Sequence, residues 1–489
     1  MALRLRRLWR RQPIEHICRA TEQHAVAPQL RRVLGITELT LMGVGVIVGA
    51  GIFVVTGTAA ALYAGPAITL SFVLAGLACA LCAMCYAELA AMMPVAGSAY
   101  TYAYVTLGEG VAWVIGWNLV LEYVFAASYV AVGWSGYFDS ILRRVGIALP
   151  ERLLAAPVAV TANHLQWTGA TANLPAIGIA LSMAALAFMG IRISTAVNAA
   201  IVILKIGVLV LVIAFGIAHV DTHLWTPFVP QASGSGTFGW SGVLRGSAVV
   251  FVSYLGFDAI ATAGQETLNP QRALPRAILG SLAIATILYV IVSLVLTGLV
   301  PYARLNVPNP LSVALAALGP SLSWLVVIVD LAAIVGLASV ILVVMLAQPR
   351  ILLAMGRDGL LPPLFGRVHA RFRTPHWGTV ISAVVVAVLA GCFPIGLLVQ
   401  LVSVGTLCVF IVVCVGVLVL RRTQPARPRS FRTPWVPVVP VLGALVCAYI
   451  LTGLQARVWH MYGLWVIAGM IIYAFYGHRR SHAAHEDSQ

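Results

Sequence analysis

Lys205 is the only lysine among the 489 residues, and it lies inside the apolar run Ala199–Ile217. A charged side chain near the centre of a bilayer costs roughly 3 kcal/mol or more, so such a residue is typical of a functional site that supplies a partner. Burial favours the neutral form of a lysine, whereas an arginine stays charged. Lys205 is therefore a candidate for a group that gains and loses a proton during a functional cycle.

Two carboxylates in other apolar segments are candidate partners of Lys205. They are Glu122, within the stretch Trp117–Tyr123, and Asp258. A static buried salt bridge is one interpretation, because breaking such a pair is costly even though it adds little net stability. A proton-coupled switch is the other, in which Lys205 is charged in one state and neutral or re-paired in the next. We favour the switch and keep the static bridge as the alternative.

Glycines interrupt two of the apolar segments. Four glycines lie between Gly43 and Gly51 in the segment 36–62, and Gly256 lies beside Asp258 in the segment 242–268. Each glycine weakens a helix by about 1 kcal/mol relative to alanine, which favours local unwinding. Interrupted helices at matching positions of two halves predict an inverted-repeat transporter with its site at the membrane midplane. The alternative for Gly45 and its neighbours is a GxxxG face for helix packing.

An unwound turn inside a helix exposes two kinds of backbone group. The N–H groups at a helix start attract a carboxylate, and free carbonyls at a helix end attract an ammonium. A free α-amino acid carries both groups on one carbon atom. The predicted donors are Ala50, Gly51 and Ile52, and the predicted acceptors are Val46 and Ile47 in the first segment and Val252, Ser253 and Leu255 in the sixth.

The composition requires these residues to be positioned by membrane helices. Hydrophobic residues make up 61% of the chain, charged residues make up 9%, and the mean hydropathy is +0.97. These values exclude a soluble globular domain, whose surface would be one large apolar patch. An all-α polytopic membrane protein is therefore expected, because about twelve segments reach the roughly 20 residues needed to cross a bilayer core. They are 36–62, 66–93, 109–138, 173–191, 194–218, 242–268, 274–300, 322–350, 376–394, 396–420, 435–454 and 460–477.

The chain has a net charge of +15, and the basic residues responsible for it are placed as the topology of these segments requires. Arginines are concentrated in the N-terminal arm 1–33, in the loops 350–373 and 421–432, and in the tail 479–489. With twelve spans, all four regions lie on one face, which the positive-inside rule makes cytoplasmic. Anionic lipid headgroups are the expected partners of this face, and nucleic acid is not.

No catalytic or metal-binding arrangement is apparent in the sequence. Cys79, Cys82 and Cys85 fall near one helix face, but their apolar surroundings favour packing over metal binding. The eleven histidines lie mostly in loops and the tail without metal-ligand spacing, and no serine–histidine–acid arrangement is found. We expect no metal, no cofactor and no enzymatic activity.

Five segments carry a resemblance to a known family. They are GVGVIVGAGIFVVTG at 43–57, YAELAAMMPVAGSAYTYAYVTLGE at 86–109, GWNLVLEY at 116–123, LGFDAIATAGQETLNPQRALPRAI at 255–278 and QPRILLAMGRDGLLPPLF at 348–365. In these segments the chain resembles the amino acid–polyamine–organocation superfamily, and within it the bacterial, twelve-helix type of the cationic amino acid transporter branch.

The resemblance implies an architecture and residue roles. Two inverted repeats of five helices, with helices 1 and 6 discontinuous, would occupy 34–421, and two further helices would occupy 422–478. Lys205 would stand where sodium-coupled relatives bind an ion, which implies proton coupling. Gly49, Ala50 and Gly51 would bind the substrate carboxylate, with Glu122 and Asp258 in the charge network around Lys205. The side-chain pocket would involve Ser253, Tyr254, Ala338, Ser339 and Met345, and it leaves a cationic and a neutral substrate both open.

These observations predict a secondary active transporter of the cell membrane with both termini in the cytoplasm. It would take up an α-amino acid together with a proton by alternating access. An amino acid exchanger without net proton movement is one alternative, and a non-transporting amino acid sensor is another. An accessory subunit is left open.

Overall fold

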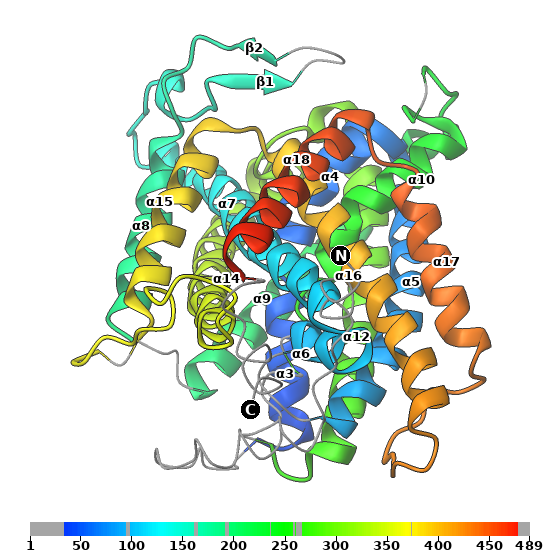
Figure 1. The fold of residues 1–489 in the computed structure, drawn as a ribbon. Coiled ribbons are helices and arrows are strands. Elements are labelled where there is room, and N and C mark those ends of the chain that lie inside the picture. Colours follow the sequence, from blue (N-terminus) through cyan, green and yellow to red (C-terminus); the bar gives the residue numbers. More distant parts are fainter. Residues whose placement is uncertain are drawn as a thin grey trace.

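The computed structural model describes residues 34–93, 98–160, 165–190, 195–234, 236–257, 260, 267–372 and 374–477. This part of the chain is a bundle of helices with one short β-hairpin (Figure 1). Each of the twelve predicted spans coincides with helical structure. Helices suit a bilayer because each satisfies its backbone hydrogen bonds within one segment. The chain is a polytopic helical membrane protein, as predicted.

Ten of the helices follow the predicted spans without a break in their regular structure. They are α5 (Ile68–Met92), α7 (Glu109–Arg144), α8 (Leu174–Phe188), α9 (Thr195–Ile217), α12 (Pro270–Leu299), α14 (Ser323–Arg357), α15 (His376–Cys392), α16 (Ile395–Thr423), α17 (Val438–Leu451) and α18 (Ala456–Ile472). Two shorter helices lie in connections, α6 (Ser98–Thr106) and α13 (Pro310–Ala316). By length and composition, seven described helical stretches could cross a membrane, and α8, α15 and α17 are shorter apolar helices.

The first and sixth predicted spans are discontinuous, as the glycines indicated. The first consists of α3 (Ile36–Ile47), a π-helical turn η2 (Gly51–Val55), α4 (Thr56–Ala59) and a second π-helical turn η3 (Ala60–Ala64). The sixth consists of α10 (Gly239–Val250) and the 3₁₀ turn η7 (Phe251–Tyr254). After η7, Leu255 is extended and Gly256 has a φ of +118°, a conformation that favours glycine.

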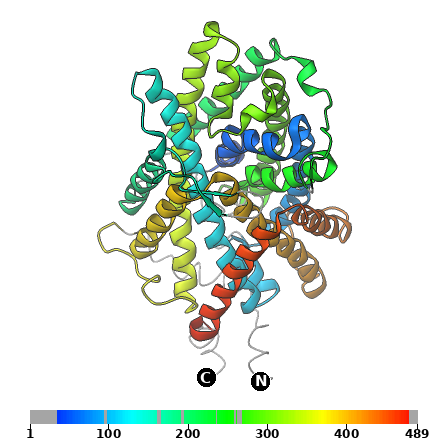
Figure 2. The same cartoon turned by 90° about the horizontal axis from the view of Figure 1, so that it is seen from above.

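The broken helices lie in the interior of the bundle. The longest helices pack around them, with α14 along α7, and α12 along both α5 and α3. Helices α8 and α15 pack together on one side, and α17 lies on the opposite side (Figures 1 and 2). The antiparallel hairpin of β1 (Val158–Val160) and β2 (Leu165–Trp167) covers one end of the α8–α15 side (Figure 1). The periphery therefore shields the breaks from the lipid.

Tryptophans fasten α18 to α7. The indole nitrogen of Trp117 donates to the Trp465 carbonyl at 2.9 Å, and that of Trp113 donates to the Gly469 carbonyl at 3.0 Å. A Cβ on Gly469 would lie 2.4 Å from the Trp117 ring, so this close approach requires glycine. Buried indole N–H groups need such partners, and here the main chain of α18 provides them.

A buried carboxylate fastens the α16–α17 connection to α5. Glu88 is 1% exposed, and it accepts hydrogen bonds from Arg421 at 3.0 Å and from the Thr433 N–H at 2.8 Å. Arg429, whose side chain is almost fully buried, lies 3.1 Å from the same carboxylate. Glu88 is thus the shared anion of two arginines, which explains a carboxylate at the end of an apolar helix.

Replacing Glu88 with alanine should destabilise the protein by about 3 kcal/mol, because Arg429 would remain buried without its counter-ion. Thermal unfolding of the purified protein in detergent measures the loss. The matched control is Glu151→Ala, which removes an exposed carboxylate from the β1–α7 connection and should leave the melting temperature unchanged. Equal melting temperatures for the two variants would contradict a stabilising role of Glu88.

Candidate functional site

The two breaks are in direct backbone contact. A Cβ built on Gly51 would lie 2.3 Å from Ser253 Cβ and 2.5 Å from Ser253 Cα. A Cβ built on Gly256 would lie 2.5 Å from Val46 and 3.2 Å from the Ile47 nitrogen. Any larger residue at Gly51 or Gly256 would push the first and sixth segments apart. The glycines therefore serve close approach as well as unwinding.

The helix start at Gly51 offers donors for an anion. Ala50 precedes the first turn, and the N–H groups of a first turn have no partner within their own helix. Their positive end attracts a carboxylate. Beside them, the buried Ser253 hydroxyl has no hydrogen-bond partner in the described part of the chain. Ala50, Gly51 and Ile52 thus lie at a helix start beside the Ser253 hydroxyl, and their binding of a carboxylate stays a prediction.

Gly49 has a different role from the one that the resemblance implied. Its N–H donates to the Ile47 carbonyl at 2.8 Å, so it is already used within the turn. In a regular helix this N–H would bond the carbonyl four residues earlier, which belongs to Gly45. Gly49 therefore forms the turn that releases the Gly45 carbonyl.

Lys205 donates a hydrogen bond to the released Gly45 carbonyl. Its Nζ donates to the Gly45 oxygen at 2.9 Å, and the side chain is 1% exposed. A Cβ on Gly336 of α14 would lie 2.6 Å from Lys205 Cε, so glycine makes room for the lysine stem. Gly45 also packs closely on Val202 of α9, so the helix-packing alternative holds for this residue as well. Gly45 therefore both offers its carbonyl to Lys205 and allows α3 to pack closely on α9.

The proposed counter-ions are located only in part. Glu122 is buried on α7, and Asp258 lies outside the described residues. The hydrogen bond described for Lys205 goes to the main chain of α3. The charge network of Lys205 with Glu122 and Asp258 stays a prediction.

The carbonyls of the sixth segment differ from the expectation at one position. Val252 was expected to have a free carbonyl, but its oxygen accepts the Leu255 N–H at 3.2 Å. The reason is that η7 closes as a 3₁₀ turn, whose bonds join residues three apart. The Tyr254 hydroxyl donates to the Phe72 carbonyl of α5 at 2.8 Å and so points away from the break. The Ser253 carbonyl lies 2.8 Å from the Tyr289 hydroxyl of α12.

Tyr289 of α12 joins the two breaks, and the sequence analysis missed it. Its hydroxyl lies 2.6 Å from the Ile47 oxygen and 2.8 Å from the Ser253 oxygen, and the side chain is 0% exposed. It is the only tyrosine in α12. A single tyrosine in such an apolar span was the available signal, since buried tyrosine hydroxyls need a partner.

The wall formed by α14 also differs from the expectation. Gly336 contacts Lys205, and Val340, one turn later, lies 3.2 Å from the Cβ position of Gly49. Ala338 is about 200° around the helix from Gly336 and so faces elsewhere. The Ser339 hydroxyl bonds back to the Gly336 carbonyl at 2.7 Å. Met345 is buried, but it lies more than two turns beyond Gly336.

One end of the bundle is closed over the first segment. A Cβ on Gly57 would lie 2.4 Å from the Leu305 carbonyl, so the connection from α12 to α13 rests on α4. The buried Asp330 of α14 accepts a hydrogen bond from Ser312 of α13 and another from Ser140 of α7 at 2.6 Å. Asp330 therefore ties α13 to two long helices.

The opposite end of α14 is also fastened. Asp358 accepts a hydrogen bond from the Tyr100 hydroxyl of α6 at 2.6 Å. Burial and the Asp358 carboxylate raise the pKa of Tyr100, so its hydroxyl stays protonated and remains a donor. The breaks thus lie between the hydrogen bonds of Asp330 at one end of the bundle and the hydrogen bond of Asp358 at the other.

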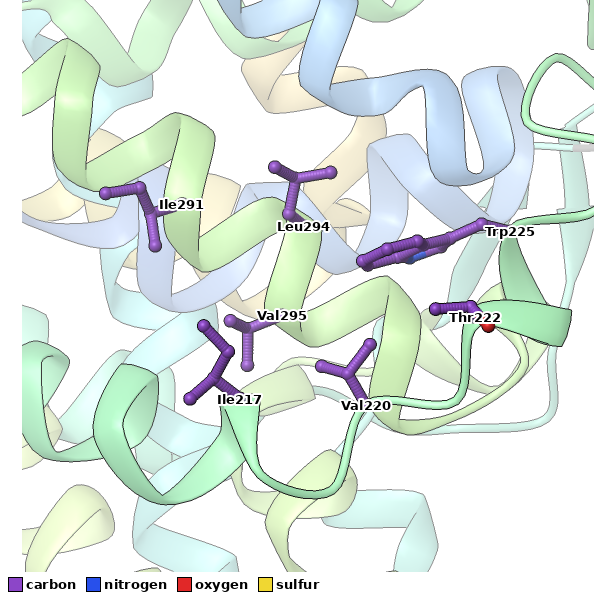
Figure 3. A pocket seen from close by; sticks show the side chains of 7 residues that line it. All are labelled: Ile217, Val220, Thr222, Trp225, Ile291, Leu294 and Val295. Carbon is purple, nitrogen blue, oxygen red and sulfur yellow. The ribbon is translucent and has the colours of Figure 1, made fainter.

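A cavity of about 310 Å³ lies away from the breaks, at the ends of α9 and α12 (Figure 3). Its lining is almost entirely aliphatic, with Thr222 and Trp225 contributed by the 3₁₀ turn η6 (Thr222–Trp225). No charged side chain lines it. The polar side-chain groups of its lining are the Thr222 hydroxyl and the Trp225 indole nitrogen.

Comparisons with known proteins identify the family of this chain. A sequence profile of the amino acid permease family matches residues 34–475. The chain is 44% identical to the methylthioribose transporter of Bacillus subtilis and 42% identical to the branched-chain amino acid permease BcaP of the same organism. Both alignments cover 97% of this chain and 98% of the relative. It is 40% identical to the vacuolar cationic amino acid transporter 4 of Arabidopsis thaliana, over 81% of this chain and 64% of the relative. All three relatives are named as transporters or permeases. The chain belongs to the amino acid permease family.

Proposed function

We propose that the chain is a proton-coupled α-amino acid symporter of the cell membrane that works by alternating access. The observation that carries the proposal is the contact between Gly51 and Ser253. It brings a helix start, whose first N–H groups have no partner within their own helix, next to Ser253. The carbonyls of Ser253 and Ile47 are close enough to contact the same Tyr289 hydroxyl. Donors for a carboxylate and acceptors for an ammonium thus lie side by side, as the two groups on one α-carbon require.

The proposal includes an architecture and an orientation. Residues 34–421 would form the two five-helix repeats, with 422–478 adding two helices. The arginine-rich arm 1–33 and the tail 479–489 would lie in the cytoplasm, because cytoplasmic segments carry the excess of positive charge.

Proton coupling would act through the bond between Lys205 and the Gly45 carbonyl. Hydrogen bonds from a charged donor are about twice as strong as neutral ones, so loss of the proton weakens the tie between α9 and α3. Because α3 ends at the substrate site, its position relative to α9 would depend on the charge of Lys205. Glu122 and Asp258 are the candidate groups that exchange the proton.

An uncharged, apolar side chain fits the proposed site best. Val46 and Val340, which contact the breaks, are apolar, and the branched-chain permease BcaP is a close relative. Methylthioribose is the second candidate substrate, because the relative that is 44% identical is named as its transporter. Methylthioribose has no carboxylate and no ammonium, so it would leave the charged features of the site unused.

Binding and flux assays separate these possibilities. Thermal-shift measurements with the twenty amino acids and methylthioribose identify the ligand, since a ligand stabilises the state that it binds. In proteoliposomes, uptake driven by an acid-outside gradient without internal amino acid supports symport. A strict need for internal amino acid would indicate an exchanger, and binding without flux would indicate a sensor. Stabilisation by methylthioribose alone would refute the amino acid assignment.

Replacing Ser253 with alanine should weaken amino acid binding roughly tenfold, because a hydrogen bond to a charged group contributes about 1.5–3 kcal/mol. Isothermal titration of purified protein with the ligand found by thermal shift measures the change. Ser182→Ala, on the exposed face of α8, is the control, because its hydroxyl bonds only its own helix at Gly178. Unchanged affinity in Ser253→Ala would show that this hydroxyl does not contact the substrate.

A further inference from the structure

The Tyr289 hydroxyl occupies the position where the proposed function requires the substrate ammonium. It lies between two main-chain carbonyls, 2.6 Å from the Ile47 oxygen and 2.8 Å from the Ser253 oxygen. These oxygens belong to the two segments that the substrate would bridge. The inference below rests on the proposed function and goes beyond it, because it concerns the site without substrate.

The Tyr289 hydroxyl cannot donate to both carbonyls at once, because a phenol has one hydrogen to donate. The Ile47 oxygen also accepts the Gly49 N–H at 2.8 Å, so these two carbonyls share two donors in the empty site. An ammonium has three hydrogens and can satisfy both, with one left over for the phenol oxygen. The ammonium is therefore the better partner for this pair of buried acceptors, and the hydroxyl is a partial substitute.

The ring of Tyr289 is held in place by its neighbours. Its centroid lies 5.3 Å from that of Phe72 and 5.3 Å from that of Tyr254. The Tyr254 hydroxyl is itself engaged by the Phe72 carbonyl. The Tyr289 hydroxyl is thus positioned by packing against α5 and the sixth segment, independently of any substrate.

We infer that, in the empty site, the Tyr289 hydroxyl takes the place of the substrate ammonium. In the empty carrier its hydroxyl donates to the Ile47 or the Ser253 carbonyl, one at a time, and so links the two broken segments. When an amino acid enters, its ammonium takes over both carbonyls, and the phenol oxygen becomes an acceptor. Tyr289 therefore stabilises the empty site and competes with the substrate.

Tyr289→Phe tests this inference, because it removes only the hydroxyl. The empty variant should melt at a lower temperature than the wild type. Its dissociation constant for the amino acid should fall roughly tenfold, since loss of the phenol hydrogen leaves the Ile47 and Ser253 carbonyls with one donor fewer and raises the free energy of the empty state most. A purely structural tyrosine would lower the melting temperature and leave the dissociation constant unchanged.

Tyr462→Phe is the matched control. Tyr462 is a buried tyrosine of the peripheral α18, and its hydroxyl accepts a hydrogen bond from Asn118 at 2.8 Å. This variant should lower the melting temperature and keep the wild-type dissociation constant. An unchanged or larger dissociation constant in Tyr289→Phe would overturn the inference while leaving the proposed function intact. Failure of the wild type to bind any amino acid would overturn both.

A second measurement keeps the hydroxyl and applies if Tyr289→Phe does not fold. The protein is prepared with 3-fluorotyrosine at position 289 alone, and its fluorine resonance is recorded with and without saturating amino acid. The resonance should shift on binding, because the phenol changes from donor to acceptor, and a label at position 462 should not shift. A constant resonance at position 289 in protein that the same amino acid stabilises would overturn the inference.

Discussion

Replacing Lys205 with methionine will reduce proton-driven uptake roughly 100-fold, since charge-assisted hydrogen bonds to a buried carbonyl contribute up to about 3 kcal/mol. Methionine keeps the apolar stem that fills the space beside Gly336, so the fold should be retained. The tie between α9 and the Gly45 carbonyl is lost, and no group at this position can carry the proton. Amino acid binding, which uses other groups, should change much less than transport.

Proteoliposomes with an acid-outside gradient measure the uptake, and thermal shift measures the binding. Leu204→Met is the control, because Leu204 is 42% exposed on the same helix and faces away from the breaks. It should transport like the wild type. Full gradient-driven uptake by Lys205→Met would refute the role of Lys205 in coupling, while loss of binding together with uptake would place Lys205 in substrate recognition instead.

Replacing Gly51 with alanine will remove measurable amino acid binding. The added Cβ would lie 2.3 Å from Ser253 Cβ, and because it would also lie 2.5 Å from Ser253 Cα, no side-chain rotation relieves the clash. The broken segments must then separate, which moves the N–H groups of the first segment away from the Ser253 carbonyl. Overpacking of this kind also costs about 1–3 kcal/mol of stability.

Ligand-induced thermal shift is the measurement for Gly51→Ala. Gly178→Ala is the control, because a Cβ on Gly178 of α8 meets no atom within 4 Å. That variant should bind normally and melt at or slightly above the wild-type temperature, since alanine favours a helix over glycine. Wild-type binding by Gly51→Ala would show that the close contact between the two segments is unnecessary for recognition.

The sequence was sufficient to locate both breaks. Glycine spacing around Gly49 and Gly256 identified the two interrupted helices, and the cost of burying an amine singled out Lys205. These features depend on local chemistry, which a single sequence contains. The expectation for Val252 was wrong because the sequence does not show whether a broken helix ends in a 3₁₀ turn.

The residues supplied by other helices could not be predicted in the same way. Gly336 and Val340 contact the site because of the rotation of α14 about its own axis. Each residue turns a helix by 100°, so an uncertainty of two residues reverses the face that is expected to point inward. That uncertainty placed Ala338 in the pocket in place of Gly336. Tyr289 was missed for a related reason, since only the packing of α12 against both breaks reveals its partners.

The bond between Lys205 and Gly45 ends on a main-chain oxygen. Every amino acid type has this oxygen, so no substitution at position 45 can delete the acceptor, and only a change in the path of the chain can move it. The proposed binding of a zwitterion by peptide groups would have the same protection. Substitutions of side chains that line the site, such as Val340, can then change which substrate is accepted. The main-chain groups proposed to bind its amino and carboxyl groups stay the same. Selection can therefore diversify the substrate range of such a carrier without changing the main-chain groups that bind the part common to all its substrates.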